Sequence, residues 1–377
     1  MRFFSNKTTV AIVLTCVCII VSVLGTAHAQ ESASGSVYSF VYLGDLHFDK
    51  KSHHDLEWVK ATMPGDLRQI EEYDRNATEF MPGLLKRVQT AIESNNGRIK
   101  MVVQGGDLVE GLCGGRERQE VQFREARVFV RQFIPRTSFL AVKGNHDITG
   151  PGAKEAYDRI MLPWLSEECG KKVDSASFYF LRGPDLFVFF DAYQSNSPDW
   201  LEKTLEEHPH RYAFVVMHPP AVPYGARSTW HLFSKAKEEA TRERFLNILG
   251  ANRAILLTGH LHKYSILGRK TSTGAFVQLS ISSVISTPKV SVKDLREGVK
   301  EYGDSLVDLE PEFQPATKDE RRKSLEREKP YITRFEYADF AGYAILHVSD
   351  ARVSADIYLG DSEKLWRTIP LAPVRNN

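Results

Sequence analysis

Short apolar runs and amphipathic stretches alternate along the chain from about residue 36. The runs are rich in β-branched and aromatic residues and are only a few residues long, which favours buried β-strands. The stretches between them repeat apolar residues at spacings of three and four, as Leu85, Val88 and Ile92 do, and this period predicts helices. The predicted strands are residues 36–43, 98–104, 137–142, 178–181, 185–193, 213–217 and 254–258, and the predicted helices are 80–95, 116–133, 154–165, 199–208 and 235–249.

Beyond residue 262 the pattern changes to strands, predicted at 265–270, 275–282, 331–337, 342–348 and 353–359. Between them, a segment at about 291–330 is dense in charge and poor in large apolar residues. We expect a solvated, partly helical and mobile insertion there, with a lid over a functional site as the alternative. Alternating strands and helices followed by strands predict an α/β fold, which we place in a single domain at 30–377.

The N-terminus has the pattern of a targeting segment. Arg2 and Lys7 precede an apolar stretch at 10–25, and a small-x-small site ends at Ala29. This pattern predicts a secretory signal peptide at 1–29, with a secreted or periplasmic mature protein and no stable membrane association after cleavage. The alternative is an uncleaved anchor, although a spanning helix needs about 20 apolar residues.

Charge and cysteine content narrow the partners only slightly. The formal net charge is +1, and loss of the two cations of the signal segment leaves −1. No global positive field therefore indicates a nucleic-acid partner. Two of the four cysteines lie in the signal segment, and Cys113 and Cys169 remain. An oxidising compartment permits a disulfide between them, but the sequence leaves their pairing open.

Five of the predicted strands end in polar clusters. These are Asp45 and His47 after 36–43, Asp107 after 98–104, Asn145, His146 and Asp147 after 137–142, His218 after 213–217, and His260 and His262 after 254–258. One such cluster alone fits a polar turn. Because ligands of open α/β sheets bind at the carboxyl ends of strands, five of them favour one shared site.

The residue types in these clusters suit a metal centre. Imidazole, carboxylate and amide groups together fit manganese, iron or zinc, and also cobalt or nickel. Two such ions bridged by a carboxylate, about 3.5–4 Å apart, can clamp a phosphate and generate hydroxide at neutral pH. The sequence has no Walker-type glycine loop and no G-x-S-x-G motif, which argues against P-loop transfer and serine hydrolysis.

With GDLH, GGD, GNHD, VVMH and GHLH in this order, the sequence resembles the calcineurin-like metallophosphoesterase family over roughly residues 38–265. The resemblance implies a four-layer αββα sandwich of two mixed β-sheets. It also implies a first metal ion held by Asp45, His47 and His262, a bridging Asp107, and a second ion held by Asp107, Asn145, His218 and His260. His146 would protonate the leaving oxygen, and Asp147 would orient its imidazole.

Some positions depart from better-known branches of this family. Purple acid phosphatases carry a tyrosine three residues after the bridging aspartate, where this chain has Glu110, so no coloured iron–tyrosinate site is expected. The phosphate-binding arginine of Ser/Thr protein phosphatases is missing from its usual place. Arg116 or Arg118 could replace it, or both are exposed helix residues. Other candidates for the site are Asp49, the pair at 53–54 and the stretch at 280–288, each with a purely structural alternative.

These observations predict an exported, dinuclear metal-dependent phosphoesterase that hydrolyses phosphodiesters or small phosphate esters by attack of metal-bound hydroxide. The motifs are most similar to phosphodiesterase-like branches. The alternatives are a phosphomonoesterase or nucleotidase of the same fold and a non-catalytic module that binds phosphate ligands. The sequence leaves the substrate, the metals and the oligomeric state open.

Overall fold

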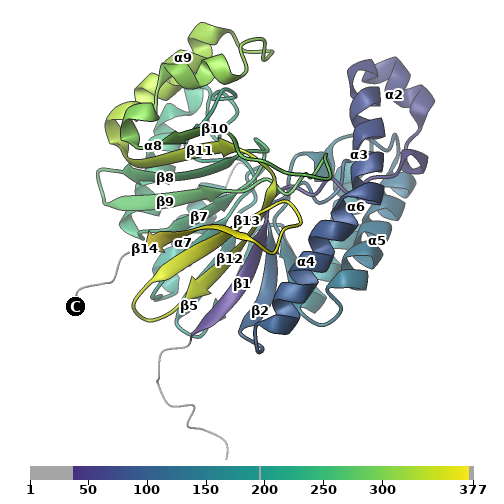
Figure 1. Cartoon of the computed structure of the whole chain (residues 1–377), viewed down its shortest axis with the longest axis horizontal. Coiled ribbons are helices and arrows are strands. Elements are labelled where there is room, and N and C mark those ends of the chain that lie inside the picture. Colours follow the sequence, from purple (N-terminus) through teal and green to yellow (C-terminus); the bar gives the residue numbers. More distant parts are fainter. Residues whose placement is uncertain (1–36, 195–196, 373–377) are drawn as a thin grey trace, which may run out of the picture. The chain divides into compact units, whose positions relative to one another are not determined.

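The structure is a computed structural model that describes residues 37–194 and 197–372. It contains two β-sheets, which are built largely from the predicted apolar runs (Figure 1). The first sheet contains, in spatial order, β14 (Leu365–Ala372), β13 (Val353–Leu359), β12 (Gly342–Val348), β1 (Tyr38–Leu43), β2 (Ile99–Gln104) and β3 (Ser138–Ala141). The second contains β10 (Lys293–Glu297), β11 (Ile332–Asp339), β8 (Tyr264–Lys270), β9 (Ala275–Ser280), β7 (Ile255–Thr258), β6 (Ala213–Val216), β5 (Asp185–Phe189) and β4 (Phe178–Arg182).

Both sheets are mixed. The strands β1, β2 and β3 pair in parallel, and so do β5, β6, β7 and β9, whereas the remaining pairs are antiparallel. Parallel neighbours place their carboxyl ends at the same edge of a sheet. The strand ends that carry the polar clusters therefore meet along one edge of each sheet.

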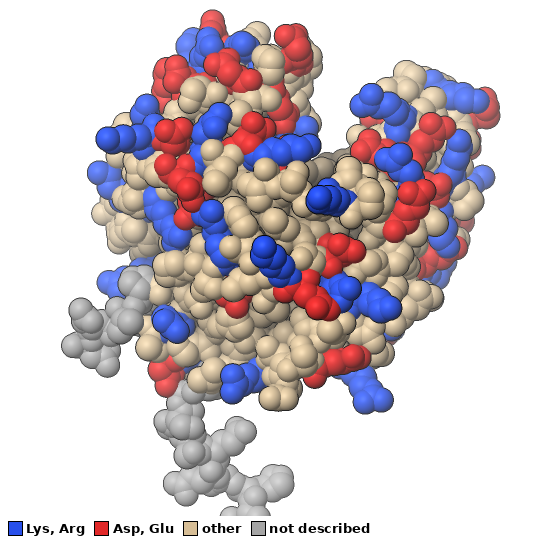
Figure 2. Space-filling view, viewed as in Figure 1, with Lys and Arg blue, Asp and Glu red and all other residues tan. Residues whose placement is uncertain are grey.

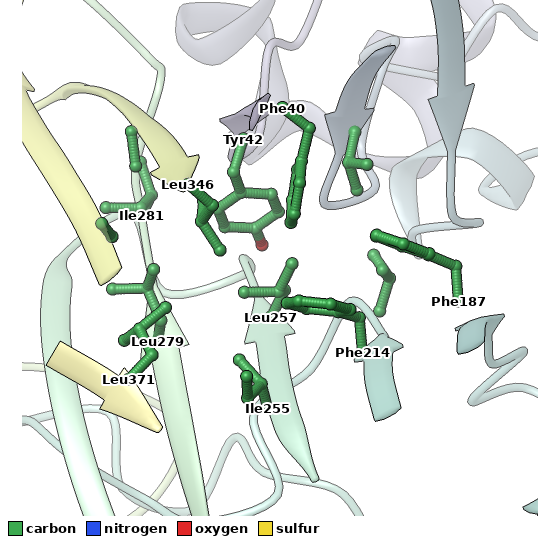
Figure 3. Packing of buried hydrophobic residues seen from close by; sticks show 14 of the residues in the cluster. Phe40, Tyr42, Phe187, Phe214, Ile255, Leu257, Leu279, Ile281, Leu346 and Leu371 are labelled. Carbon is green, nitrogen blue, oxygen red and sulfur yellow. The ribbon is translucent and has the colours of Figure 1, made fainter. Parts of the chain in front are cut away.

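The two sheets pack face to face through an apolar core (Figure 3). Phe40 of β1 makes edge-to-face contacts with Phe187 of β5 and Phe214 of β6, each with 5.3 Å between ring centroids. Every residue of β1 is buried, because its other face is covered as well. Burial on both faces explains why this strand reads as a nearly continuous apolar run.

Helices cover the outer face of each sheet. The helices α4 (Met81–Ser94), α5 (Arg116–Phe133) and α6 (Ala153–Cys169) share an apolar core with the first sheet, and α7 (Ser197–Glu207) and α8 (Glu239–Ala251) share one with the second. On α5 the buried residues Phe123, Ala126 and Val130 follow the helical spacing. The predicted α/β class and four-layer αββα arrangement are confirmed.

Four regular elements were not predicted: α2 (Leu56–Thr62), α3 (Leu67–Glu79), β10 and β14. The strands β10 and β14 are the edges of their sheets. Edge strands often carry charged residues and proline, as KDLRE and LWRTIPLA do here, so their pattern does not reveal them. The helix α3 buries only one narrow stripe and is otherwise polar.

The charged segment at 291–330 contains β10, two 3₁₀ turns (Val299–Glu301 and Asp304–Leu309) and α9 (Lys318–Glu328). Its partly helical nature is confirmed, and many of its charged side chains are exposed. The inner face of α9 differs from the expected solvated segment, because Arg321 and Glu328 are only 1% and 2% exposed. This face is anchored to the second sheet and its loops.

The predicted signal peptide lies outside the described residues. Within 37–194 and 197–372, no helix combines the length and apolarity needed to cross a membrane. Cys113 is buried, Cys169 is partly buried, and both are free thiols, so the disulfide that the sequence left open is not formed in this structure.

Candidate metal centre

The five strand ends bring their polar side chains together in turns with an unusual backbone. The positive φ angles there are 50° at His47, 53° at Asp107, 75° at His260 and 54° at His262. Residues other than glycine rarely adopt this conformation, and it concentrates at functional sites where the surrounding structure enforces it. The backbone thus turns sharply to aim these side chains at one point.

Two glycines permit the close approach of these turns. Gly106 has a φ of 92°, and a Cβ there would lie 2.6 Å from Nδ1 of His218. A Cβ on Gly144 would lie 2.1 Å from Oδ1 of Asp107. Loops from different strands can therefore touch only because these positions lack a side chain.

The first group of ligand atoms comes from Asp45, His47 and His262, which lie within 4.8 Å of one another. Nε2 of His47 is 3.0 Å from Nε2 of His262, and the latter is 3.5 Å from Oδ1 of Asp45. Nδ1 of His47 donates to Oε2 of Glu110 at 2.7 Å. This bond leaves the Nε2 lone pair of a neutral His47 facing the other ligands.

The second group comes from Asp107, His218 and His260, with Asn145 beside them. Nε2 of His218 lies 2.9 Å from Oδ2 of Asp107 and 3.1 Å from Oδ1 of Asn145. Nδ1 of His218 donates to the carbonyl of Gly105 at 2.9 Å, which fixes the tautomer. Nε2 of His218 therefore faces the oxygen atoms of Asp107 and Asn145, and a cation bound between them would displace the proton from this nitrogen.

Asp107 faces both groups. Its Oδ2 is 2.9 Å from Nε2 of His218 and 3.8 Å from Nε2 of His47. These contacts are those that a carboxylate shared between two cations would make. The structure thus places all seven predicted metal ligands together, in the two predicted sets.

The charges of the site fit cations. Burial opposes ionisation of Asp45, but the imidazoles of His262 and His218 outweigh it and lower its pKa. The pKa of Asp107 is held well below its usual range, again against burial, by His218 and other nearby imidazoles. Burial and the neighbouring His218 lower the pKa of His260 to about 3, which keeps that ring neutral. Burial opposes protonation of His218, but the carboxylates of Asp107 and Asp45 raise its pKa to about 9, so a bound cation would take the place of a proton at this ring. Carboxylates and imidazoles are donors that suit divalent metals.

His146 stands beside the two groups and lines the cavity above them. Its Nδ1 donates to the carbonyl oxygen of Glu110 at 2.9 Å and lies 3.3 Å from the Glu110 carboxylate. Burial opposes its protonation, but the carboxylates of Glu110 and Asp107 raise its pKa to about 9. A partly exposed imidazole held at Nδ1 can present Nε2 to a bound substrate.

The structure corrects the expected role of Asp147. Its buried carboxylate accepts hydrogen bonds from the backbone amides of Asp107, Val109 and Gly144 at 3.1, 3.2 and 2.8 Å. These bonds join the loop after β2 to the loop after β3. Glu110 contacts the His146 imidazole instead, so sequence reasoning missed the group that orients this ring.

The contacts of the other candidates for the site, among them His54, Arg116 and Arg118, indicate structural roles. His54 uses Nδ1 toward the carbonyl of Leu112 and Nε2 toward Asp49, so neither nitrogen is free for a metal. Arg116 pairs with acidic neighbours on α5, and Arg118 contacts backbone carbonyls. Both arginines therefore fit the structural interpretation.

A cavity of about 730 Å³ lies over the ligands. One wall comes from Gln69 and Tyr73 of α3, and another from a loop that carries Arg227 and Trp230. The Trp230 ring lies 5.6 Å from the His260 ring. In the space-filling view a hollow separates the side with α9 from the side with α2 and α3 (Figure 2). No pattern in the sequence points to these wall residues, because they lie outside the strand ends.

The family follows from the sequence itself. The sequence profile described as calcineurin-like phosphoesterase matches residues 38–264. The chain belongs to the calcineurin-like phosphoesterase family. It is accordingly a metal-dependent phosphoric ester hydrolase with the metallophosphoesterase fold. No curated protein is similar enough to this sequence to count as a match.

The fold resembles that of a purple acid phosphatase of known structure. A purple acid phosphatase from yellow lupin, Lupinus luteus, aligns over 91% of this chain and 55% of its own length, with 10% identity and a TM-score of 0.53. GAP50, described as the anchor in the inner membrane complex of Plasmodium, has 12% identity, 90% coverage of both chains and a TM-score of 0.49. A dimetal phosphatase from Danio rerio has 14% identity, covers 89% of this chain and 99% of its own, and has a TM-score of 0.49.

Proposed function

We propose that this phosphoesterase acts outside the cytoplasm, with two metal ions, on phosphodiesters or small phosphate esters. The observation that carries the proposal is the position of Asp107, whose Oδ2 faces both groups of ligand atoms. Asp45, His47 and His262 would hold one ion, and Asn145, His218 and His260 the other, with Asp107 shared. Manganese, iron and zinc fit this donor set best, and cobalt and nickel also fit it.

Two bound cations supply the Lewis acidity that polarises a phosphoryl group and lowers the pKa of water. The protein's own residues position the substrate and move the proton. His146 lines the cavity and is held at Nδ1 by the Glu110 carbonyl. Its Nε2 would donate a proton to the leaving oxygen. Arg227, which lines the same cavity, would contact a phosphate oxygen.

A His146→Ala variant tests this assignment. We expect kcat to fall roughly 10²–10⁴-fold for an ester with a poor leaving group, because the proton donor is lost. Metal content, measured by elemental analysis, should stay at the wild-type level. His210→Ala, which changes a partly exposed histidine outside the cavity, is the matched control. Loss of metal from the His146→Ala protein would instead make that residue a ligand.

The choice between diesters and monoesters is tested by paired substrates. The motifs favour phosphodiesterase-like branches, so we expect a higher kcat/KM for bis-p-nitrophenyl phosphate than for p-nitrophenyl phosphate. A preference of tenfold or more for the monoester would replace this proposal with a phosphomonoesterase or nucleotidase. Turnover of neither ester by the metal-loaded protein would favour a binding module.

Export is supported by the basic start, the apolar stretch at 10–25 and the small residues before Gln30. N-terminal sequencing of the mature protein should give Gln30 as its first residue. A mature protein that retains residues 1–29 would support the uncleaved anchor instead.

A further inference from the structure

A second cavity, of about 370 Å³, adjoins the metal centre. It shares Tyr73, Arg227 and His262 with the cavity over the ligands, so the two cavities adjoin at these residues. Its other walls come from Lys263, which directly follows the metal ligand His262, and from parts of 282–293 and 339–341. A substrate held at the metal centre can therefore extend into it.

The lining of this second cavity is rich in cations. We call it the lysine groove, after Arg227, Lys263, Lys289 and Lys293, which face two acidic residues, Glu72 and Asp339. Arg227 already pairs with Glu310, with 2.9 Å between Nε and Oε2, and Lys263 pairs with Asp339, with 2.9 Å between Nζ and Oδ2. Among the described residues, neither Lys289 nor Lys293 has an acidic partner within ion-pair distance. The charges of Lys289 and Lys293 thus remain unpaired in the cavity that adjoins the metal centre.

The rest of the lining adds hydrogen-bonding groups. Ser286 and Ser291 bring hydroxyls to the wall that carries the two unpaired lysines, and the Thr287 hydroxyl donates to the carbonyl of Lys289 within this wall. Ammonium and hydroxyl groups both donate to phosphate oxygens, and a bond from an ionised donor is the stronger of the two. The stretch at 280–288, whose role the sequence left open, contributes Ser282, Val284, Ser286 and Thr287 to the lining of this cavity.

We propose that the lysine groove binds a second anionic group of the substrate, so that preferred substrates carry another phosphate beside the one that is hydrolysed. This inference rests on the proposed function, because it needs one phosphate at the metal centre. The class it selects is small organic molecules with two or more phosphoryl groups. A simple monophosphate ester would leave Lys289 and Lys293 without a ligand.

Calorimetric titration of the manganese-loaded full chain tests the inference without turnover. The two probes are 1,3-propylenediphosphonate and propylphosphonate, which differ in the second anionic group. We expect Lys289→Ala/Lys293→Ala to weaken diphosphonate binding roughly fivefold to tenfold, because two exposed cation–anion contacts are lost. Propylphosphonate binding should change less than twofold.

A matched variant controls for net charge. Lys154→Ala/Lys270→Ala removes the same two charges from exposed positions outside both cavities and should leave both affinities unchanged. Added salt should weaken diphosphonate binding more than propylphosphonate binding in the wild type. Both phosphonates should also inhibit hydrolysis of bis-p-nitrophenyl phosphate. Their inhibition constants should differ between the variants in the same way as the binding affinities do.

The outcomes separate the two proposals. Diphosphonate affinity that is the same in the wild type and in Lys289→Ala/Lys293→Ala overturns the groove, and so does an equal loss in the control variant. If the metal-centre proposal is wrong, propylphosphonate should not bind even to the metal-loaded wild type, and this result distinguishes it from failure of the groove. Without a first phosphate at the metals the groove proposal would fall as well.

Discussion

At the scale of single residues, the partner of the second ring nitrogen decides which histidines can bind a metal. His218 donates from Nδ1 to a carbonyl, and His47 donates from Nδ1 to Glu110, which points Nε2 of each ring at the other ligands. His54 uses both nitrogens within the protein. The sequence does not show the hydrogen-bond partners of a histidine. It could therefore distinguish these residues only by whether they directly follow a strand.

Glu110 illustrates what such a partner contributes. Its carboxylate lies 2.7 Å from Nδ1 of His47 and is fully buried. We expect Glu110→Ala to lower metal affinity by roughly 10–100-fold, because outer partners orient the ligand and raise its basicity. Glu110→Gln keeps an acceptor and should lose less. Metal titration followed by elemental analysis measures both, with the exposed Glu117→Ala as control. Equal affinity in all four proteins would contradict this role.

Gly144 is the residue on which the approach of two ligand loops depends. A methyl group there would lie 2.1 Å from Oδ1 and 2.2 Å from the amide of Asp107. Gly144→Ala should therefore displace Asp107 and cut both metal content and activity at least tenfold, since the shared ligand moves. Gly115→Ala is the control, because nothing lies within 4 Å of a Cβ at that position. Wild-type metal content in Gly144→Ala would show that the loops can separate without loss of the site.

At the scale of elements, α9 supports a wall of the cavity. Arg321 donates to the carbonyls of Ala226 and Glu310, at 3.1 and 2.8 Å. Ser228 donates to the carbonyl of Arg321 at 2.6 Å. These bonds hold the loop that carries Arg227 and Trp230. The charged segment at 291–330 thus acts as a support for the substrate wall, which its composition alone did not indicate.

Glu328 anchors α9 through two buried arginines, with contacts of 2.8 Å to Arg242 of α8 and 2.7 Å to Arg269 of β8. Burial raises the pKa of Glu328, but the two arginines outweigh it and hold the pKa below the ordinary 4.5. A lowered pKa means that the stability is present above pH 4.5 and is lost as pH falls below it. Glu328→Gln should cost about 3 kcal/mol of unfolding free energy at pH 7, because two buried charges lose their partner.

Denaturant unfolding of wild type and Glu328→Gln at several pH values checks this expectation. The difference in unfolding free energy between the two proteins should shrink below pH 4.5, because Glu328 of the wild type then takes up a proton and loses its charge. Glu326→Gln, at an exposed position of the same helix, should match the wild type throughout. A difference that is constant from pH 7 to pH 3 would mean that packing, and not charge, anchors α9.

At the scale of the whole molecule, the sequence predicted what depends on strand periodicity and on residues next to strand ends. The buried run of β1 and the donors Asp45 and His47 after it are an example, because both follow from local pattern. It did not predict β10, β14 or the cavity walls, whose positions depend on contacts between distant segments. Lys289 and His262 line one cavity only because β9 and the segment after it return to the ligand edge.

The metal site also joins the two sheets, since Asp45 and Asp107 follow strands of the first and His218 and His262 follow strands of the second. Metal binding should therefore stabilise the fold. Ions at a hundred times their dissociation constant add about 2.7 kcal/mol, and chelation should lower Tm by several degrees. Restoring manganese or zinc should return Tm and activity together.

Asp107→Ala, which lacks the shared ligand, should show little response to the chelator in differential scanning calorimetry. A wild-type Tm that chelation does not change, with the metal shown to be gone, would mean that the packing between the sheets, through residues such as Phe40 and Phe214, holds them without help from the site.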